Sequence, residues 1–236
     1  MKKITFIVII LAAILAVIFI FTRKEENDLV SLCYYSTKPT ESGLNDKAWV
    51  KLDINNDEKE KITGEFYHIP AESNSKVGQF EGKVNKLTSE TTSRKATVWW
   101  NAFAEGTYTM EELIIDFGEG SAVSLFGEKA DRGDGVFVYK NKNNLSASQS
   151  MGKIDCNDLE EIQTVEKYMI ENIGKVVKDE PVLGGSWYLV DILIAPAQNT
   201  GTMIFEDGHI RKEGNFKYTY EEGIVKNIST TNTIEL

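Results

Sequence analysis

Four aromatic side chains that could contact a ligand or a partner lie close together in the sequence: Trp99, Trp100, Phe103 and Tyr108. The alternation of apolar and polar residues around them predicts a β-strand, in which successive side chains point to opposite faces. Trp99 and Trp100 therefore lie on opposite faces. One face belongs to a core, and the other is either covered by another element or open as a ligand cavity or partner surface. We take these four residues as the candidate contact site.

The chain has only two histidines. His68 shares a predicted strand face with Ile62 and Phe66, so a hydrogen-bonded core histidine is favoured over a ligand. His209 lies in a turn between predicted strands, where solvent exposure is expected. The sequence contains no Gly-x-Ser-x-Gly nucleophile turn, no His-Glu-x-x-His zinc motif and no phosphate-binding glycine loop. It therefore predicts no catalytic residue, no metal site and no cofactor.

Acidic residues gather in one stretch: Glu105, Glu111, Glu112, Asp116, Glu119 and Glu128. Glycoside cleavage needs two carboxyl groups across a cleft, with the pKa of one raised. Side chains that alternate toward solvent along a strand explain most of this group without a catalytic role. A hydrolase that uses carboxylates is therefore the third hypothesis.

Residues 4–21 are apolar apart from Thr5. As a helix they span about 27 Å, close to the roughly 30 Å hydrocarbon core of a bilayer. The stretch is longer than the apolar part of a cleaved signal peptide, and no Ala-x-Ala site follows it. We predict a single-pass signal anchor over residues 1–24, with the bilayer as the partner of residues 4–21, and a linker over residues 25–32. The N-terminus is predicted to be cytoplasmic and the body extracytoplasmic.

The charge balance is acidic, with 26 basic and 36 acidic residues among 236 and a net charge of −10. Without the four basic residues that flank the apolar stretch, the body carries 22 basic and 36 acidic residues, a net charge of −14. Such a surface repels the phosphate backbone, so nucleic acid is excluded as a partner.

Cys33 and Cys156 are the only two cysteines. An extracytoplasmic body makes a disulfide between them the expected state. The bridge would tie together the ends of a β-rich region. In the chain-entropy model it would stabilise the fold by about 4–5 kcal/mol.

Hydrophobic periodicity divides the body into three parts. Residues 33–156 alternate with a period of two and contain Gly and Asn turns, which predicts an antiparallel barrel or sandwich. Residues 157–174 change to helical spacing, with Asn157 placed to cap the helix and Gly174 to end it. Residues 175–236 form a C-terminal β segment. The fold class is thus mainly β, with one amphipathic helix and a preceding transmembrane helix.

Several short motifs recur in a known group of proteins. They are Cys33-Tyr34, Gly64-Glu65-Phe66, the stretch of residues 71–82, Ala104-Glu105-Gly106 and Phe126-Gly127-Glu128. Residues 33–128 thereby resemble uncharacterised exported bacterial β-rich, lipoprotein-like envelope proteins. The lipid-bearing cysteine of that group has no counterpart here. The resemblance implies an exported β-barrel-like fold and implies no activity.

Three functions follow as hypotheses. The first is a membrane-anchored, extracytoplasmic, non-catalytic module that binds a ligand or an envelope protein. The second is a calycin-like carrier of a small apolar ligand, since Gly185-Ser186-Trp187 also resembles the Gly-x-Trp start of lipocalin-type barrels. The third is the hydrolase. An enclosed apolar cavity would favour the carrier, and facing carboxylates with a raised pKa would favour the enzyme.

Overall fold

The computed structural model describes residues 29–55, 60–85 and 93–236. The predicted transmembrane anchor of residues 1–24 and the first half of the predicted linker, residues 25–28, lie outside these ranges. The bilayer contact of residues 4–21 therefore stays a prediction. Within the described ranges, no helix combines the length and the apolar character that crossing a bilayer requires.

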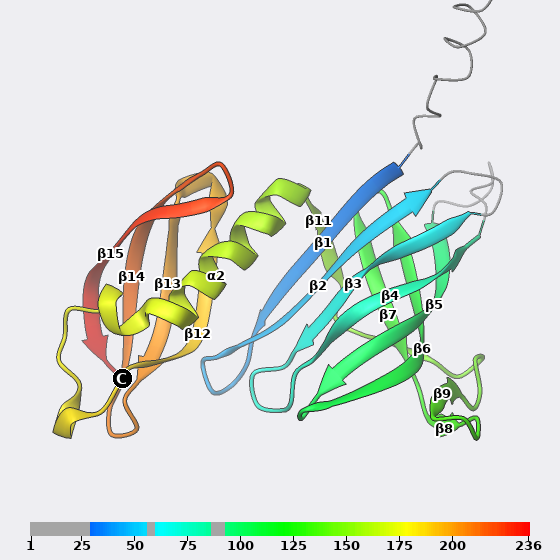
Figure 1. Ribbon diagram of the computed structural model, residues 1–236, viewed down its shortest axis with the longest axis horizontal. Helices are drawn as coiled ribbons and strands as arrows, with labels where there is room; N and C mark the ends of the chain where they lie inside the picture. The colour runs from blue at the N-terminus through cyan, green and yellow to red at the C-terminus, as the bar shows by residue number, and fades with distance from the viewer. Residues whose placement is uncertain (1–28, 56–59, 86–92) are drawn as a thin grey trace, which may run out of the picture.

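The described chain forms a large β-sheet, one long helix and a smaller β-sheet (Figure 1). The first sheet contains β1 (Leu29–Pro39), β2 (Asn45–Asn55), β3 (Lys61–Ile69), β4 (Lys76–Val84), β5 (Ser93–Ala104), β6 (Thr107–Gly118), β7 (Ser121–Phe126), β8 (Lys129–Asp131), β9 (Val136–Tyr139), β10 (Ser146–Ala147) and β11 (Met151–Ile154). The helix α2 (Cys156–Val176) follows, and the second sheet contains β12 (Tyr188–Ala195), β13 (Thr200–Glu206), β14 (Arg211–Glu221) and β15 (Ile224–Glu235). Two short 3-10 helices, η1 (Val182–Gly184) and η2 (Pro196–Gln198), flank β12. The mainly β prediction is confirmed.

Eight strands of the first sheet close into an antiparallel barrel, which decides between the barrel and the sandwich. β1 to β7 pair in chain order, and β11 closes the ring between β7 and β1. β9 and β10 pair with β6 and β7 outside this ring, and β8 pairs with β9. Closure leaves none of the eight strands with a free edge.

Alternate side chains of the barrel strands fill its interior. On β5, Val98 and Trp100 are buried inside while Trp99 faces outward, as the alternation predicted. The inward side chains form one continuous apolar core, with Tyr34, Phe66 and Trp100 among its largest members. The inward-facing side chains of the alternating strands thus fill the middle of the barrel.

The first strand, β1, begins within the segment that was predicted as a linker. β1 starts at Leu29, because its first residues pair with the end of β2, where Leu29 lies opposite Asn55. The segment predicted as a linker over residues 25–32 therefore contains part of a strand.

The helix differs from its prediction at both ends. Asp155 caps its N-terminus, and its carboxylate accepts a hydrogen bond from the backbone N–H of Asn157, so the predicted Asn157 cap is wrong. Gly174 lies inside the helix and does not end it. The helix continues because Val176 and Val177 bury their side chains in the core against the second sheet.

The helix and the second sheet share their own apolar core. β12 to β15 are antiparallel in chain order, and Met169 and Ile173 of α2 join Phe205 and Phe216 in one cluster. The residues Gly185-Ser186-Trp187 lead into β12. Their resemblance to the start of a lipocalin-type barrel therefore falls in the second sheet and not in the barrel.

The predicted disulfide is present and fastens the helix to the barrel. Cys33 on β1 is bonded to Cys156, the first residue of α2, across a sequence separation of 123. Around it, Trp49 of the barrel wall packs with Leu159 of the helix, and Trp49 also stacks on Tyr67 with ring centroids 3.9 Å apart. The bridge thus pins the start of the helix onto the outer wall of the barrel.

Candidate functional site

The structure divides the four predicted contact residues between two faces of the barrel wall. Trp100 points inward and is fully buried, and its indole N–H donates a hydrogen bond to the carbonyl oxygen of Gly78. Trp99, Phe103 and Tyr108 point outward, with Tyr108 67% exposed. The rings of Phe103 and Tyr108 pack together at 4.8 Å between centroids. These three outward residues, which we call the aromatic ridge, form a surface separate from Trp100.

A cavity of about 530 Å³ opens at the end of the barrel where β3 leads into β4 and β5 leads into β6, the lower end in Figure 1. We call it the mouth cavity. Its lining combines aromatic rings with charged and polar groups: His68, Lys76, Trp100, Thr109, Glu111, Phe126, Lys129 and Phe137. Trp100 belongs both to this lining and to the core that fills the barrel. The volume is in the range of small-molecule sites.

One carboxylate in the mouth cavity holds two ammonium groups. Glu111 is almost fully buried, and its Oε1 accepts hydrogen bonds from Lys76 and from the hydroxyl of Thr109. Its Oε2 accepts a hydrogen bond of 2.8 Å from Nζ of Lys129. We call Lys76, Glu111 and Lys129 the mouth cluster. Two positive charges and one negative charge make its net charge positive.

Burial and pairing act in opposite directions on the titration of this cluster. Burial by itself raises the pKa of Glu111, but the hydrogen bonds from Lys129, Lys76 and Thr109 outweigh it and leave the pKa below its usual value. Burial lowers the pKa of Lys129, and the nearby charge of Lys76 adds to this effect, while Glu111 opposes it. A carboxyl group with a lowered pKa is ionised at neutral pH and is a poor general acid.

Two buried polar atoms at the mouth end of the barrel have no hydrogen-bond partner. They are Oγ of Ser36 and Nδ1 of His68, and no other buried side-chain nitrogen or oxygen in the described ranges shares this property. The register places Ser36 opposite Ala48, and Ala48 opposite His68. Ser36 and His68 thus face the barrel interior at the same level. Their strands, β1 and β3, are about 10 Å apart, and the Ala48 side chain of β2 lies between them.

The position of His68 matches the prediction, but its hydrogen bonding does not. It faces inward on β3 in line with Ile62 and Phe66, as expected of a core histidine. It also lines the mouth cavity, and Nδ1 is unpaired, so the predicted hydrogen-bonded state is wrong. Burial lowers the pKa of His68, against a smaller opposing effect of the Asp46 carboxylate. The imidazole is therefore neutral at pH 7, with one nitrogen able to bond to a ligand.

A larger cavity of about 770 Å³ lies at the opposite end of the barrel, and none of its described lining residues has a buried side-chain nitrogen or oxygen without a hydrogen-bond partner. Leu32, Arg94, Phe117 and Lys153 are among its lining residues. Nε of Arg94 donates to the carbonyl oxygen of Asn85 at 3.2 Å. The mouth cavity is therefore the better candidate, despite its smaller size.

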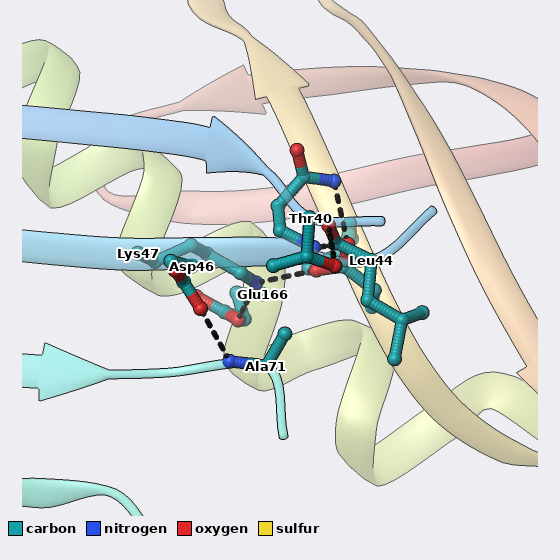
Figure 2. A network of polar contacts seen from close by, with 9 residues as sticks. Thr40, Leu44, Asp46, Lys47, Ala71 and Glu166 are labelled. Carbon is teal, nitrogen blue, oxygen red and sulfur yellow. Dashed lines mark hydrogen bonds and ion pairs between the residues drawn. The ribbon is translucent and has the colours of Figure 1, made fainter. Parts of the chain in front are cut away.

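A second charged cluster lies where the barrel meets the helix and the second sheet (Figure 2). Nζ of Lys47 on β2 is 2.8 Å from Oε1 of Glu166 on α2 and 3.2 Å from Oδ1 of Asp191 on β12. The other oxygen of Asp191 accepts hydrogen bonds from the backbone N–H and the side-chain amide of Asn45, at 3.0 Å and 2.7 Å. We call these four residues the junction cluster. It connects all three parts of the described fold.

Comparisons with known proteins give no relative for this chain: no family model, no curated protein and no solved structure matches it. In the described ranges, no group of three or more His, Cys, Asp or Glu side chains is placed to hold a metal ion. The case for a function therefore rests on the geometry of the mouth cavity.

Local sequence patterns did not reveal the mouth cluster, although one part of it left a recognisable pattern. Glu111 is in phase with Leu113 and Ile115, which both point into the barrel. A carboxylate at a core position of a strand calls for buried partners. Lys76 and Lys129 lie on β4 and β8, and no local pattern links either of them to Glu111.

Proposed function

We propose that this protein is a non-catalytic binding module whose ligand occupies the mouth cavity. The observation that carries the proposal is Nδ1 of His68, a buried atom of a residue that lines the mouth cavity, which has no hydrogen-bond partner among the described residues. A buried polar atom without a partner costs about 1–3 kcal/mol. A ligand in the mouth cavity that pairs with Nδ1 of His68 would recover this free energy.

The geometry gives less support to the two other hypotheses. A carrier that encloses an apolar ligand needs an empty barrel, whereas Phe66, Trp100 and their neighbours fill this one. A carboxylate-dependent hydrolase needs an acid with a raised pKa, whereas the pKa of Glu111 is lowered. Binding at the mouth requires neither condition.

We further propose that the module is anchored in the cell membrane with its body outside the cytoplasm. The apolar sequence of residues 4–21 supports the anchor. The disulfide between Cys33 and Cys156 supports an oxidising compartment, since such bonds are rare in the cytosol. An anchor and an oxidising compartment both fit the exported envelope proteins that residues 33–128 resemble.

Native mass spectrometry of the full chain, released from its own membrane, tests the binding proposal. We expect a retained small molecule in the wild-type protein and its loss in Thr109→Phe, which places a ring in the mouth cavity. Thr97→Phe adds the same ring to an exposed position on the outer wall and should keep the ligand. Equal retention by both variants would contradict binding in the mouth cavity.

Contact with an envelope protein through the aromatic ridge is a second candidate function. It is favoured by the exposure of packed rings at Phe103 and Tyr108, because exposed apolar groups of this kind mark interaction surfaces. A photo-crosslinking residue at position 108 should give a discrete adduct in intact membranes. The same residue at position 97 should give none, and identical adducts from both positions would exclude the ridge.

A further inference from the structure

The mouth cavity offers more hydrogen-bond donors than acceptors. Each lysine ammonium carries three N–H groups. Lys76 and Lys129 each use one of them on Glu111, and neither has another hydrogen-bond acceptor in the described protein. Glu111 is already occupied on both oxygens, since Thr109 donates to the oxygen that Lys76 also contacts. The groups of the mouth cluster that are left over are therefore N–H donors.

The lysines are held in place by aromatic rings as well as by Glu111. Nζ of Lys129 lies 4.8 Å from the ring centroid of Tyr139, and Nζ of Lys76 lies 5.7 Å from that of Trp100. The Lys129 side chain is only 13% exposed, so water can satisfy few of its donors. A ligand that reaches Lys129 meets an ammonium group that is already fixed, which lowers the entropy cost of binding.

Neighbouring acidic groups leave this surplus of donors intact. The charge of the Asp46 carboxylate raises the pKa of His68. Oδ1 of Asp46 already accepts a hydrogen bond from the backbone N–H of Ala71 (Figure 2). Glu112 is adjacent in sequence to Glu111 but faces the outside of the barrel, where it pairs with Lys142. Neither carboxylate lines the mouth cavity.

Resting on the function proposed above, we infer that the ligand of the mouth cavity is a small amphiphilic organic anion. Its negatively charged group accepts hydrogen bonds from Lys76 and Lys129. Its apolar body lies against the rings of Trp100, Phe126 and Phe137. A neutral ligand of the same shape would leave the surplus ammonium groups desolvated and unpaired, which costs free energy.

Two probes of nearly equal shape test the role of charge: naphthoate, an anion, and naphthamide, its neutral counterpart. Each is titrated calorimetrically into the full chain in lipid nanodiscs, with empty nanodiscs as the blank. We expect one naphthoate per chain and an affinity at least about tenfold higher than that of naphthamide, because charge-assisted hydrogen bonds are the stronger ones. Equal affinities would overturn the anion inference and leave the proposed binding function in place. Binding of neither probe would overturn both.

Single substitutions test whether the preference for naphthoate over naphthamide arises in the mouth cavity. Lys129→Met should reduce naphthoate affinity about tenfold and leave naphthamide affinity unchanged. Lys153→Met, at the opposite end of the barrel, should change neither. Glu111→Gln keeps the side-chain shape and removes the competing charge, so it should strengthen naphthoate binding. An unchanged ratio of the two affinities in both Lys129→Met and Glu111→Gln would overturn the inference even if one variant were poorly folded.

The anionic group can belong to a free molecule or to a lipid. Nanodiscs made from anionic lipid, compared with nanodiscs of zwitterionic lipid, separate these sources. Weaker naphthoate binding in the anionic nanodiscs indicates that a lipid headgroup competes for the mouth cavity. Equal binding in both indicates a free organic anion.

Discussion

The junction cluster and the mouth cluster contain the same kinds of charged side chain in opposite proportions. At the junction, the single ammonium group of Lys47 meets two carboxylates, and the adjoining cleft measures about 120 Å³. At the mouth, two ammonium groups share the carboxylate of Glu111 beside a cavity of about 530 Å³. Glu111 and Lys129 at the mouth, like Lys47 and Asp191 at the junction, are largely shielded from solvent, whereas the Lys76 side chain is 34% exposed.

This difference separates a structural contact from the proposed binding site. Both oxygens of Asp191 have protein partners, and the junction joins elements that lie 146 residues apart in sequence. Charged groups that pair with one another beside a cleft of only about 120 Å³ stabilise an arrangement and leave little room for a ligand. The mouth cavity, in contrast, is lined by ammonium groups with unused N–H donors and by His68, whose Nδ1 has no hydrogen-bond partner among the described residues. Four predictions test this distinction.

The largest expected effect is on stability, when the disulfide is removed. Cys33→Ser with Cys156→Ser should lower the free energy of unfolding by about 4–5 kcal/mol, because a loop of this length is no longer closed in the unfolded chain. Urea unfolding of the full chain in nanodiscs measures it. The wild-type protein in reductant is the control and should show the same loss. A loss of less than about 1 kcal/mol would mean that the junction holds the helix without the disulfide.

Removing the junction ammonium should have the next largest effect. Lys47→Met leaves two carboxylates facing each other, with the Asp191 side chain only 6% exposed, and should cost about 3–5 kcal/mol. Lys140→Met breaks the exposed pair with Glu128 and should cost under about 1 kcal/mol. Naphthoate affinity should be unchanged in Lys47→Met. A large loss of affinity would erase the distinction between the two clusters.

Removing an ammonium group from the mouth cluster should lower stability only slightly and ligand affinity strongly, the reverse of the effects of Lys47→Met. Lys129→Met leaves Glu111 with Lys76 and Thr109 as partners, so the free energy of unfolding should fall by only about 1–2 kcal/mol. The affinity for naphthoate should fall about tenfold in the same protein. If the stability loss equals that of Lys47→Met, the mouth cluster is mainly a structural contact.

The smallest effect is a pH dependence of stability. The pKa of His68 is lower in the folded protein than in the unfolded chain, so the unfolded chain takes up this proton first as the pH falls below about 6.5. Stability should therefore decrease on acidification from that point, and Glu111, whose folded-state pKa is also lowered, should add a further loss below about pH 4.

Unfolding measured from pH 8 to pH 3 separates the two contributions. His68→Gln should remove the loss near neutrality and keep the loss in acid. His209→Gln, at an exposed turn, is the matched control and should resemble the wild-type protein. A wild-type curve that is flat between pH 7 and pH 5 would show that His68 is not buried in its neutral form.

Local patterns predicted the elements well because each pattern has a local physical cause. Alternation placed Val98 and Trp100 on the face opposite Trp99, since successive strand residues point to opposite sides. Helical spacing found α2, although its cap was misplaced, because Asp155 and Asn157 are both good capping residues. The cysteine count, together with the predicted export, indicated the disulfide.

The sequence by itself indicated a mainly β body with one helix, the disulfide and the acidic character of the body. Only the tertiary structure decided that the strands form a closed barrel, because alternation is the same in a barrel and in a sandwich. It also decided that Lys76 and Lys129, on β4 and β8, meet at Glu111 on β6. Such meetings depend on which strands pair and on how the ring closes. No local pattern carries that information, so the candidate site appears only when the barrel is complete.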